Sequence, residues 1–281
     1  MHILIADIGS TKSIWTVLDK NSHESYETIG FNPNYQSKEE ISAVFSNVKS
    51  NLNINKIAVC YLYGAGIDSK DSTLVLQDIC AQQLPPNIDL ILENDLLAAA
   101  RCCFNDNESG VIAILGTGSN IRSYNKGKLT GESKSLGYIL GDEGGGVGFG
   151  KHLVRAFIYG DLSPEIEQIL SDLNHTKSSI INSVYNEVYP QKYLANFARI
   201  IYPYRYEPSV KLLIEKNFTD FITSHVLKIE DIQNKDLKFV GSMAYYFEDI
   251  LIETAKKNNI TIKHCYQNPM HGLIDYHKNN I

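Results

Sequence analysis

The feature that most constrains the fold of this chain is a repeated hairpin. ILIADIGSTKSIWTVLD begins at Ile3 and VIAILGTGSNIRSYN begins at Val111, so the two stretches lie about 108 residues apart. Each opens with an apolar strand, turns through Gly with Ser or Thr, and returns along a second strand. Short hairpins also resemble one another by chance, but this pair predicts an internal duplication of one domain core.

The segments that follow each hairpin predict two α/β domains. Residues 1–109 continue with a third strand, HESYETIGF, and then alternate helices and strands, which indicates a mixed sheet with helices packed on it. Residues 110–267 repeat the three strands and then show apolar residues at helical spacing over about 150–230. We expect this region to be a helical insertion in the second domain, and 268–281 to end the chain as a helix.

Composition excludes several classes of function. The 281 residues, 43% of them hydrophobic, suffice for one large or two medium domains. The net charge of −6, with no long run of one sign, argues against a surface for nucleic acid or anionic membranes. No segment approaches the roughly 18 apolar residues of a membrane span, and no signal peptide is evident. We therefore expect a cytoplasmic protein with no nucleic-acid or membrane partner.

The cysteines and histidines predict no metal centre. The five cysteines form no C-x-x-C pair, and the eight histidines form no cluster with them. In a reducing compartment such cysteines are expected to be free thiols. They are Cys60, Cys80, Cys102, Cys103 and Cys265.

Both hairpins carry residues that suit a phosphate group. In ADIGSTKS, the turn from Gly9 to Lys12 offers backbone N–H groups and hydroxyls to a phosphate, and Asp7 can hold Mg²⁺ through water. GTGSN, residues 116–120, repeats the same device. Each turn alone is also typical of an ordinary tight hairpin. Two such turns in a duplicated chain predict that a triphosphate is held from both sides.

Two further strand ends are candidate ligand sites. Asp95 follows the strand IDLILEN and begins an Ala-rich helix, so it either caps that helix or takes a proton from an attacking hydroxyl. Gly241 and Ser242 follow the strand DLKFV, and they form either an ordinary strand–turn–helix junction or a backbone platform for adenine or ribose. Ligand groups in α/β proteins gather at such carboxyl ends of strands.

The stretch GDEGGGVGFGKH, from Gly141, resembles a P-loop only in part. Gly145 and Gly150-Lys151 have the required spacing, but His152 stands where a P-loop has Ser or Thr. The preceding LGYILGDEG is only loosely strand-like, and acidic residues beside the loop would repel an anion. We expect instead a Gly-rich entry to a helix, whose glycines bring the backbone close to a sugar and whose Asp142 faces a neutral polar ligand.

Taken together, these motifs resemble the actin-like ATPase superfamily, and within it the N-acetylglucosamine kinase branch of the BadF/BadG/BcrA/BcrD-type ATPase family. ADIGSTKS and GTGSN match the two phosphate motifs, and FVGSMA matches the adenosine motif. LENDLLAAA matches the segment with the catalytic aspartate, and GDEGGG matches the acidic Gly-rich loop. NPN and LYGAG, at residues 32–34 and 62–66, resemble the substrate-side loops.

The resemblance implies two ribonuclease-H-like domains facing a central cleft, with the last helix packed back on the first domain. It implies that Asp95 is the base for the 6-hydroxyl of an amino sugar, and that Asp7 positions Mg²⁺. The residues it implies for ATP are Gly9, Ser10, Thr11, Lys12, Gly116, Thr117, Gly118, Gly241 and Ser242. The residues it implies for the sugar are Asn32, Gly64, Asn94, Ser119, Asn120 and Asp142.

The activity that this resemblance implies is transfer of the ATP γ-phosphate to O6 of N-acetylglucosamine. Glucosamine, N-acetylmuramate and other hexosamines remain alternative acceptors. An ATPase that activates a partner enzyme is a second hypothesis, although no cysteine lies in the motif such activators use to share an iron–sulfur cluster. A sensor without catalysis is a third. The partner we expect is a small-molecule amino sugar, and a homodimer is left open.

The chain departs from the family in two places. The Cys-rich zinc motif common in the related ROK sugar kinases is absent. The acidic loop, usually Gly-Asp-Glu-Gly-Ser, here continues with Gly145 and Gly146. The resemblance therefore implies the zinc-free branch.

Overall fold

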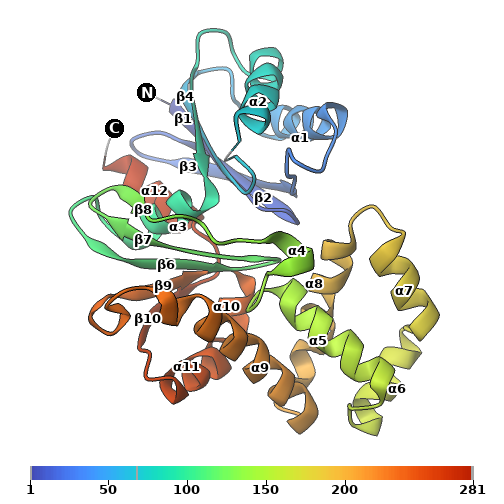
Figure 1. Ribbon diagram of the computed structural model, residues 1–281. Coiled ribbons are helices and arrows are strands. Elements are labelled where there is room, and N and C mark those ends of the chain that lie inside the picture. The colour runs from blue at the N-terminus through green and yellow to red at the C-terminus, as the bar shows by residue number, and fades with distance from the viewer. Residues whose placement is uncertain (1, 68, 280–281) are drawn as a thin grey trace. The chain divides into compact units, whose positions relative to one another are not determined.

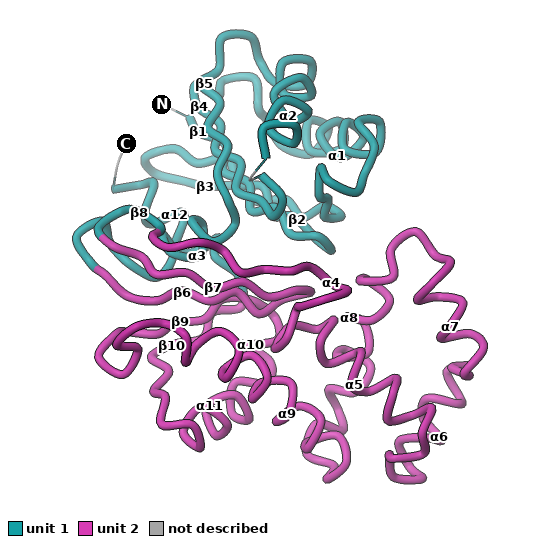
Figure 2. The backbone as a smooth tube through the Cα atoms, viewed as in Figure 1, with its two compact units in different colours: residues 1–108, 126–129, 268–281 teal, residues 109–125, 130–267 magenta. Residues whose placement is uncertain are grey.

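The structure, a computed structural model, describes residues 2–67 and 69–279 and contains two five-stranded sheets (Figure 1). The chain divides into two units, which are coloured separately in Figure 2. Unit 1 comprises residues 1–108, 126–129 and 268–281, and unit 2 comprises 109–125 and 130–267. The chain therefore returns to its first unit with its last helix. None of the helices described is both long and apolar enough to cross a bilayer.

The sheet of unit 1 has the strand order β3-β2-β1-β4-β5. β1 (His2–Ile8) pairs antiparallel with β2 (Lys12–Leu18), which pairs antiparallel with β3 (His23–Ile29). On its other edge β1 pairs parallel with β4 (Ile57–Gly64), which pairs parallel with β5 (Asp89–Asn94). This is the mixed sheet that the sequence pattern predicts.

Alternation along β1 determines which helices cover each face of this sheet. Leu4, Ala6 and Ile8 pack in the cluster that includes the apolar residues of α1 and α2, whereas Ile3 and Ile5 pack with those of α3 and α12. Because successive side chains of a strand point to opposite faces, Asp7 lies on the α3/α12 face. The helices are α1 (Lys38–Asn51), α2 (Lys70–Gln83), α3 (Asp95–Cys103) and α12 (Met270–Lys278).

The sheet of unit 2 repeats this arrangement with the order β10-β9-β6-β7-β8. β6 and β7 form an antiparallel hairpin, and β9 and β10 add parallel strands on the far edge of β6. The two sheets share one strand order, as the duplicated hairpin predicts. The strands are β6 (Ser109–Leu115), β7 (Ser119–Asn125), β8 (Lys128–Thr130), β9 (Leu237–Val240) and β10 (Ile262–Tyr266).

The insertion between β8 and β9 is helical, as expected, but its first helices differ from the expectation. LGYIL forms the short helix α4 rather than a loose strand, and α5 begins at Gly146, inside the Gly-rich stretch. The α-helices of unit 2 are α4 (Gly137–Leu140), α5 (Gly146–Tyr159), α6 (Pro164–Asp172), α7 (Lys177–Tyr185), α8 (Pro190–Ile201), α9 (Pro208–Ser224), α10 (Ser242–Tyr246) and α11 (Glu248–Lys257). The described part of this unit also has the 3₁₀ turns η1 (Tyr202–Tyr204), η2 (Val226–Lys228) and η3 (Ile232–Asn234).

The glycines of α5 serve helix packing, a role that the sequence analysis did not assign to them, and the expectation that they approach a sugar stays a prediction. A Cβ added to Gly150 would lie 2.2 Å from the carbonyl oxygen of Leu194 on α8, and one added to Gly146 would lie 3.1 Å from the Ala195 side chain. Only glycine permits so close an approach of two helix backbones. Gly146 and Gly150 therefore allow α5 and α8 to pack closely inside unit 2.

A buried polar network ties α12 to the sheet of unit 1. Arg101 Nη1 donates a hydrogen bond of 2.7 Å to the Tyr63 hydroxyl, which lies 2.9 Å from His277 Nε2. Because the arginine can only donate, the arrangement that also uses the Tyr63 proton has the hydroxyl donating to an unprotonated His277 Nε2. Burial, assisted by the Arg101 charge, lowers the pKa of His277 to about 4.

We predict that His277 makes the protein less stable at acid pH. Between its ordinary pKa near 6.5 and about 4, the unfolded chain binds a proton at His277 that the folded chain does not. Relative to His277→Gln, the wild-type free energy of unfolding should therefore fall on acidification, by on the order of 3 kcal/mol, because each pH unit of the window is worth about 1.4 kcal/mol. Urea titrations at a series of pH values measure this difference.

The exposed His271 on the same helix supplies the control, since its side chain is 94% accessible. The His271→Gln variant should follow the wild-type pH dependence. If the unfolding free energies of wild type and His277→Gln stay parallel from pH 7 to pH 4, the protonation state assigned to His277 is wrong.

Candidate functional site

The carboxyl ends of β1, β4 and β5 bring several of the predicted residues together in unit 1. Asp7 is in register with Tyr63 of β4, and Tyr63 with Glu93 of β5. In the next row Ile8, Gly64 and Asn94 are in register, and the chain leaves the sheet there. The parallel pairing therefore sets Asp7, Gly64 and Asn94 at one edge, where α/β sheets bind ligands.

Asp7 and Asp95 form an acidic pair at this edge. Burial, and to a smaller extent the negative charge of Asp95, raise the pKa of Asp7 to about 7, and Lys12 acts in the opposite sense. Two neighbouring carboxylates suit a bound cation. Mg²⁺ commonly takes only one or two carboxylates from the protein and fills its other positions with water and phosphate. The residues present therefore fit the metal that the sequence predicts at Asp7.

Asn94 supplies the cap of α3. Its side-chain oxygen accepts a 2.7 Å hydrogen bond from the Leu96 N–H, and Asp95 Oδ1 lies 2.8 Å from the same donor. Asn94 occupies the N-cap position, and Asp95 Oδ1 shares the same N–H donor. The helix therefore has a cap without Asp95, and both interpretations of Asp95, as a capping group and as a base, stay open.

The first hairpin turn is closed by its own backbone. The Gly9 N–H donates to the Lys12 carbonyl at 3.0 Å, and the Gly30 N–H donates to the Thr11 carbonyl at 2.8 Å. Lys12, which we expected at a phosphate, pairs with Glu27 of β3 at 2.7 Å. Both side chains are about half exposed, so the pair is worth at most about 1 kcal/mol and leaves Lys12 able to move to an anion.

Asn32 lies in a tight loop beside the end of β4. Its Oδ1 accepts a 2.9 Å hydrogen bond from the Asn34 N–H, and its own N–H donates to the Gln36 side chain at 2.9 Å. A Cβ on Gly66, which has φ of +81°, would lie 2.4 Å from Asn32 Oδ1. The two segments that sequence analysis assigned to the substrate, NPN and LYGAG, are therefore in contact.

In unit 2, the second hairpin turn sits on the start of α5. The carbonyls of Gly116 and Thr117 accept hydrogen bonds from the N–H groups of Gly146 and Val147, at 2.8 and 2.9 Å. These are first-turn N–H groups, which a P-loop would offer to phosphate. Since protein carbonyls occupy them, the stretch from Gly145 does not act as a P-loop.

Asp142 caps the tip of the same hairpin. Its backbone has φ of +64°, and its Oδ1 accepts a 3.0 Å hydrogen bond from the Ser119 N–H. Burial raises the pKa of Asp142, while the Ser119 hydrogen bond and Lys151 lower it. Asn120, also on β7, accepts hydrogen bonds from the Ile121 N–H and the Ser133 hydroxyl, both at 2.9 Å. Ser119, Asn120 and Asp142 are thus brought together.

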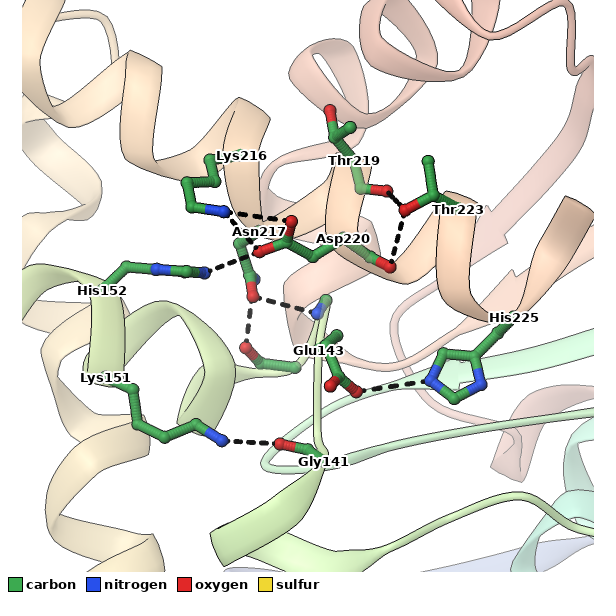
Figure 3. Close-up of polar contacts among 12 residues, drawn as sticks. Gly141, Glu143, Lys151, His152, Lys216, Asn217, Thr219, Asp220, Thr223 and His225 are labelled. Carbon is green, nitrogen blue, oxygen red and sulfur yellow. Dashed lines mark hydrogen bonds and ion pairs between the residues drawn. The ribbon is translucent and has the colours of Figure 1, made fainter.

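Side chains of α5 and α9 hold the acidic loop in place (Figure 3). Lys151 donates to the Gly141 carbonyl at 2.6 Å, and His225 Nε2 lies 3.3 Å from Glu143 Oε2. The buried Asn217 accepts from the Gly144 N–H at 2.9 Å and donates to the Gly145 carbonyl at 3.2 Å. His152, the residue that broke the P-loop pattern, instead pairs with Asp220 of α9 at 3.0 Å.

Gly241 and Ser242 adjoin this hairpin at the carboxyl end of β9. Gly241 has φ of +121°, and a Cβ there would lie 2.4 Å from the Leu115 carbonyl oxygen. Its N–H donates to the Tyr266 carbonyl at 2.8 Å, which fixes the junction between β9 and α10. The predicted adenosine platform and the second phosphate turn therefore share one end of the unit 2 sheet.

The five cysteines are free thiols, as the sequence predicts. Across residues 2–67 and 69–279, no group of three or more His, Cys, Asp or Glu side chains could hold a metal ion. Burial raises the pKa of the Cys80 thiol to about 12. The Cys80 thiol is therefore a poor metal ligand and a poor nucleophile.

Sequence reasoning did not identify two residues that shape these sites, Glu27 and Asn217. Glu27 has no motif, and only the pairing of β2 with β3 brings it to Lys12. Asn217 carried a weak signal, because it is a polar residue on the apolar face of a helix in LLIEKNFTDFI. A fully buried amide is normally retained for a specific hydrogen-bond partner.

Comparison with known proteins gives the following relatives. The crystal structure of a "Putative N-acetylglucosamine Kinase" from Porphyromonas gingivalis has a TM-score of 0.90 and 33% sequence identity, and covers 99% of both chains. N-acetyl-D-glucosamine kinase of Dictyostelium discoideum is 26% identical over 53% of this chain. N-acetylmuramic acid/N-acetylglucosamine kinase of Clostridium acetobutylicum is 26% identical over 60% of this chain. No protein-family model matches the chain.

The two curated relatives are longer than the region they share with this chain. The matches span 51% and 59% of their lengths. The P. gingivalis structure, in contrast, matches from end to end, and it confirms the expected fold with its two sheets. Because 33% identity extends over 99% of both chains, this chain belongs to the same N-acetylglucosamine kinase-like family as the P. gingivalis protein, and it has the expected actin-like ATPase fold.

Proposed function

We propose that this protein is an ATP-dependent kinase that phosphorylates the 6-hydroxyl of an amino sugar, with N-acetylglucosamine as the preferred acceptor. The observation that carries the proposal is the acidic pair Asp7 and Asp95 at one sheet edge, beside the Gly9–Lys12 turn. One carboxylate can serve a metal and the other a hydroxyl proton, which are the two tasks of phosphoryl transfer to an alcohol. The relatives named above support the choice of acceptor.

In this proposal Asp95 accepts the proton of the sugar hydroxyl as the oxygen attacks the γ-phosphorus. The turn from Gly9 to Lys12, and the turn of Gly116, Thr117 and Gly118, hold the phosphates through backbone and hydroxyl groups. Mg²⁺, held near Asp7, supplies neutralisation of phosphate charge when it is bound. Gly241 and Ser242 support the adenosine.

For the sugar we propose polar groups within each unit taken by itself. In unit 1 these are Asn32, Gly64 and Asn94, and in unit 2 they are Ser119, Asn120 and Asp142. Asp142 Oδ1 is taken by the Ser119 N–H, and the described residues give its Oδ2 no partner. We propose that Oδ2 accepts a hydrogen bond from a sugar hydroxyl, which suits a neutral polar ligand.

Within the superfamily, we propose the BadF/BadG-type branch. The acidic loop from Gly141 to Gly145 and the free cysteines both support a zinc-free kinase. The ATPase-activator alternative is disfavoured, because such activators use cysteines to share an iron–sulfur cluster, whereas Cys60 and Cys80 are buried here.

We predict that N-acetylglucosamine is the best acceptor in a panel with glucosamine, N-acetylmannosamine and N-acetylmuramate. The measurement is ADP release at saturating ATP, followed by NMR of the product to locate the phosphorylated carbon. The preference over the other hexosamines should be modest if only a methyl-sized contact separates them, since such a contact is worth about 1–3 kcal/mol. Sugar binding without ADP release would support a sensor instead, and phosphate on any carbon other than C6 would contradict the proposed reaction.

We predict that Asp95→Asn lowers kcat by roughly 10² or more, as expected for loss of a general base. The binding of ATP and sugar, measured by calorimetry, should be nearly unchanged because the amide has the same shape. Asp89→Asn, at the exposed opposite end of β5, is the matched control and should keep wild-type turnover. Near wild-type turnover in Asp95→Asn would remove Asp95 from the role of base.

We predict that the Mg²⁺ requirement rises as the pH falls below 7. The pKa of Asp7 is raised to about 7, so its carboxyl carries a proton below that pH and the cation must displace it. The Mg²⁺ concentration for half-maximal rate should therefore rise roughly tenfold per pH unit at acid pH, because one proton competes at the site.

Asp7→Asn is the comparison for this experiment. Both proteins are measured with the same nucleotide. The variant should need more Mg²⁺ for half-maximal rate at every pH, and this concentration should not show the wild-type dependence on pH. Equal Mg²⁺ requirements for the two proteins would show that Asp7 does not serve the metal.

A further inference from the structure

Residues from three successive turns on one side of α9 contact the acidic loop, Gly141 to Gly145. Asn217, Phe221 and His225 are spaced by four residues, so they lie on one face of the helix and its end. Asn217 hydrogen-bonds to Gly144 and Gly145, the Phe221 side chain packs on the Gly144 backbone, and His225 contacts Glu143. Figure 3 shows Asn217 and His225 pointing at the loop from α9.

Asn217 is the centre of this contact. It is 0% exposed within an otherwise apolar core, and its amide both accepts from the Gly144 N–H and donates to the Gly145 carbonyl. An unsatisfied buried amide would be unfavourable, so the loop and the helix depend on each other for these two bonds. No other side chain of the described insertion bonds to both Gly144 and Gly145.

Gly148 of α5 leaves the space that the Asn217 side chain occupies. A Cβ at Gly148 would lie 2.5 Å from Asn217 Oδ1 and 2.5 Å from the Asp142 carbonyl oxygen. Any larger residue at Gly148 would push the amide away from the loop, the loop away from α5, or both. The Gly145 N–H in turn donates to the Asp142 carbonyl at 3.2 Å, which links the gripped glycines directly to the aspartate.

We propose that Asn217 is a positioning residue that sets the acidic loop, and through it the Asp142 carboxylate, for the sugar. This inference rests on the proposed function for its choice of ligand. Asn217 touches neither nucleotide nor sugar in this account, so it acts only through the loop. Its loss should weaken sugar recognition selectively, because a small displacement of a positioned group is costly.

The first test replaces the amide with an apolar group of similar size, Asn217→Leu. The KM for N-acetylglucosamine should rise roughly 10- to 100-fold while the KM for ATP stays near wild type. Deuterium exchange in the segment 141–149 should become faster, because the Gly144 N–H loses its acceptor. Thr254→Val is the matched control. Thr254 is 1% exposed and its hydroxyl donates to the Ile250 carbonyl at 2.7 Å, so the control loses a buried hydrogen bond away from the loop.

Asn217→Asp provides a second, pH-dependent test. A protonated carboxyl can reproduce both bonds of the amide, whereas an ionised one turns a charged oxygen toward the Gly145 carbonyl. Burial raises the pKa of such a carboxyl, so this variant should bind sugar nearly normally at low pH and lose affinity as the pH rises. The variant-to-wild-type ratio of sugar KM is the quantity compared.

Other ionisable groups surround this position, and the ratio cancels their own titration. On the loop they are Asp142 and Glu143; on α5, Lys151 and His152; on α9, Lys216 and Asp220, with His225 just after its end. α11 contributes Glu253 and Lys257, which pair with Lys211 and Glu215 elsewhere on α9. All these groups are present in both the wild type and Asn217→Asp, so their titration affects the sugar KM of both proteins.

The outcomes separate three cases. If the sugar KM of the Asn217 variants is unchanged and their loss of stability resembles that of Thr254→Val, Asn217 is merely structural and the proposal is overturned. If the wild-type protein phosphorylates no amino sugar, the proposed function fails, while exchange in 141–149 still decides whether Asn217 holds the loop. The expected result is faster deuterium exchange in 141–149 and a raised sugar KM, with the KM for ATP unchanged. In Asn217→Asp, the ratio of variant to wild-type sugar KM should also rise with pH.

Discussion

The parallel alignment of β1 with β4 and β5 is the constraint on which the site in unit 1 depends. It fixes Asp7, Tyr63 and Glu93 in one row and Ile8, Gly64 and Asn94 in the next, so that three distant segments end at the same edge. Alternation along β1 then places Asp7 on the face covered by α3, the helix that Asp95 begins. Two carboxylates are thereby forced into proximity in a partly desolvated place, and the raised pKa of Asp7 is the consequence.

The sequence predicted the parts of the fold that local rules control. Alternating apolar residues located the strands, and the repeated Gly-Ser/Thr turns located both hairpins, because strand period and turn chemistry are properties of neighbouring residues. It did not predict that α5 starts at Gly146. Glycine has poor intrinsic helix propensity, and only the packing against α8, visible at Gly146 and Gly150, stabilises the helix there.

The residues of the candidate site likewise fall into those that local sequence patterns identify and those that only long-range contacts bring together. Residues in contiguous motifs, such as Gly9–Lys12 and Gly116–Asn120, could be named from the sequence, although their ligand roles remain predictions. Glu27 could not be named, because its relevance comes from the register between β2 and β3. Asn217 lies 72 residues from Gly145, and no local pattern encodes a contact of that separation.

The two hairpin turns show how a duplicated device can be stabilised in different ways. In unit 1 the turn closes on itself and on Gly30, and its lysine is paired with Glu27 in solvent. In unit 2 the turn is docked on α5 through the Gly116 and Thr117 carbonyls. Backbone hydrogen bonds fix both turns, but the Lys12 side chain of the first is held only by an exposed ion pair. The first turn therefore leaves a positive charge able to move, whereas the second holds its backbone against a helix beside Asp142.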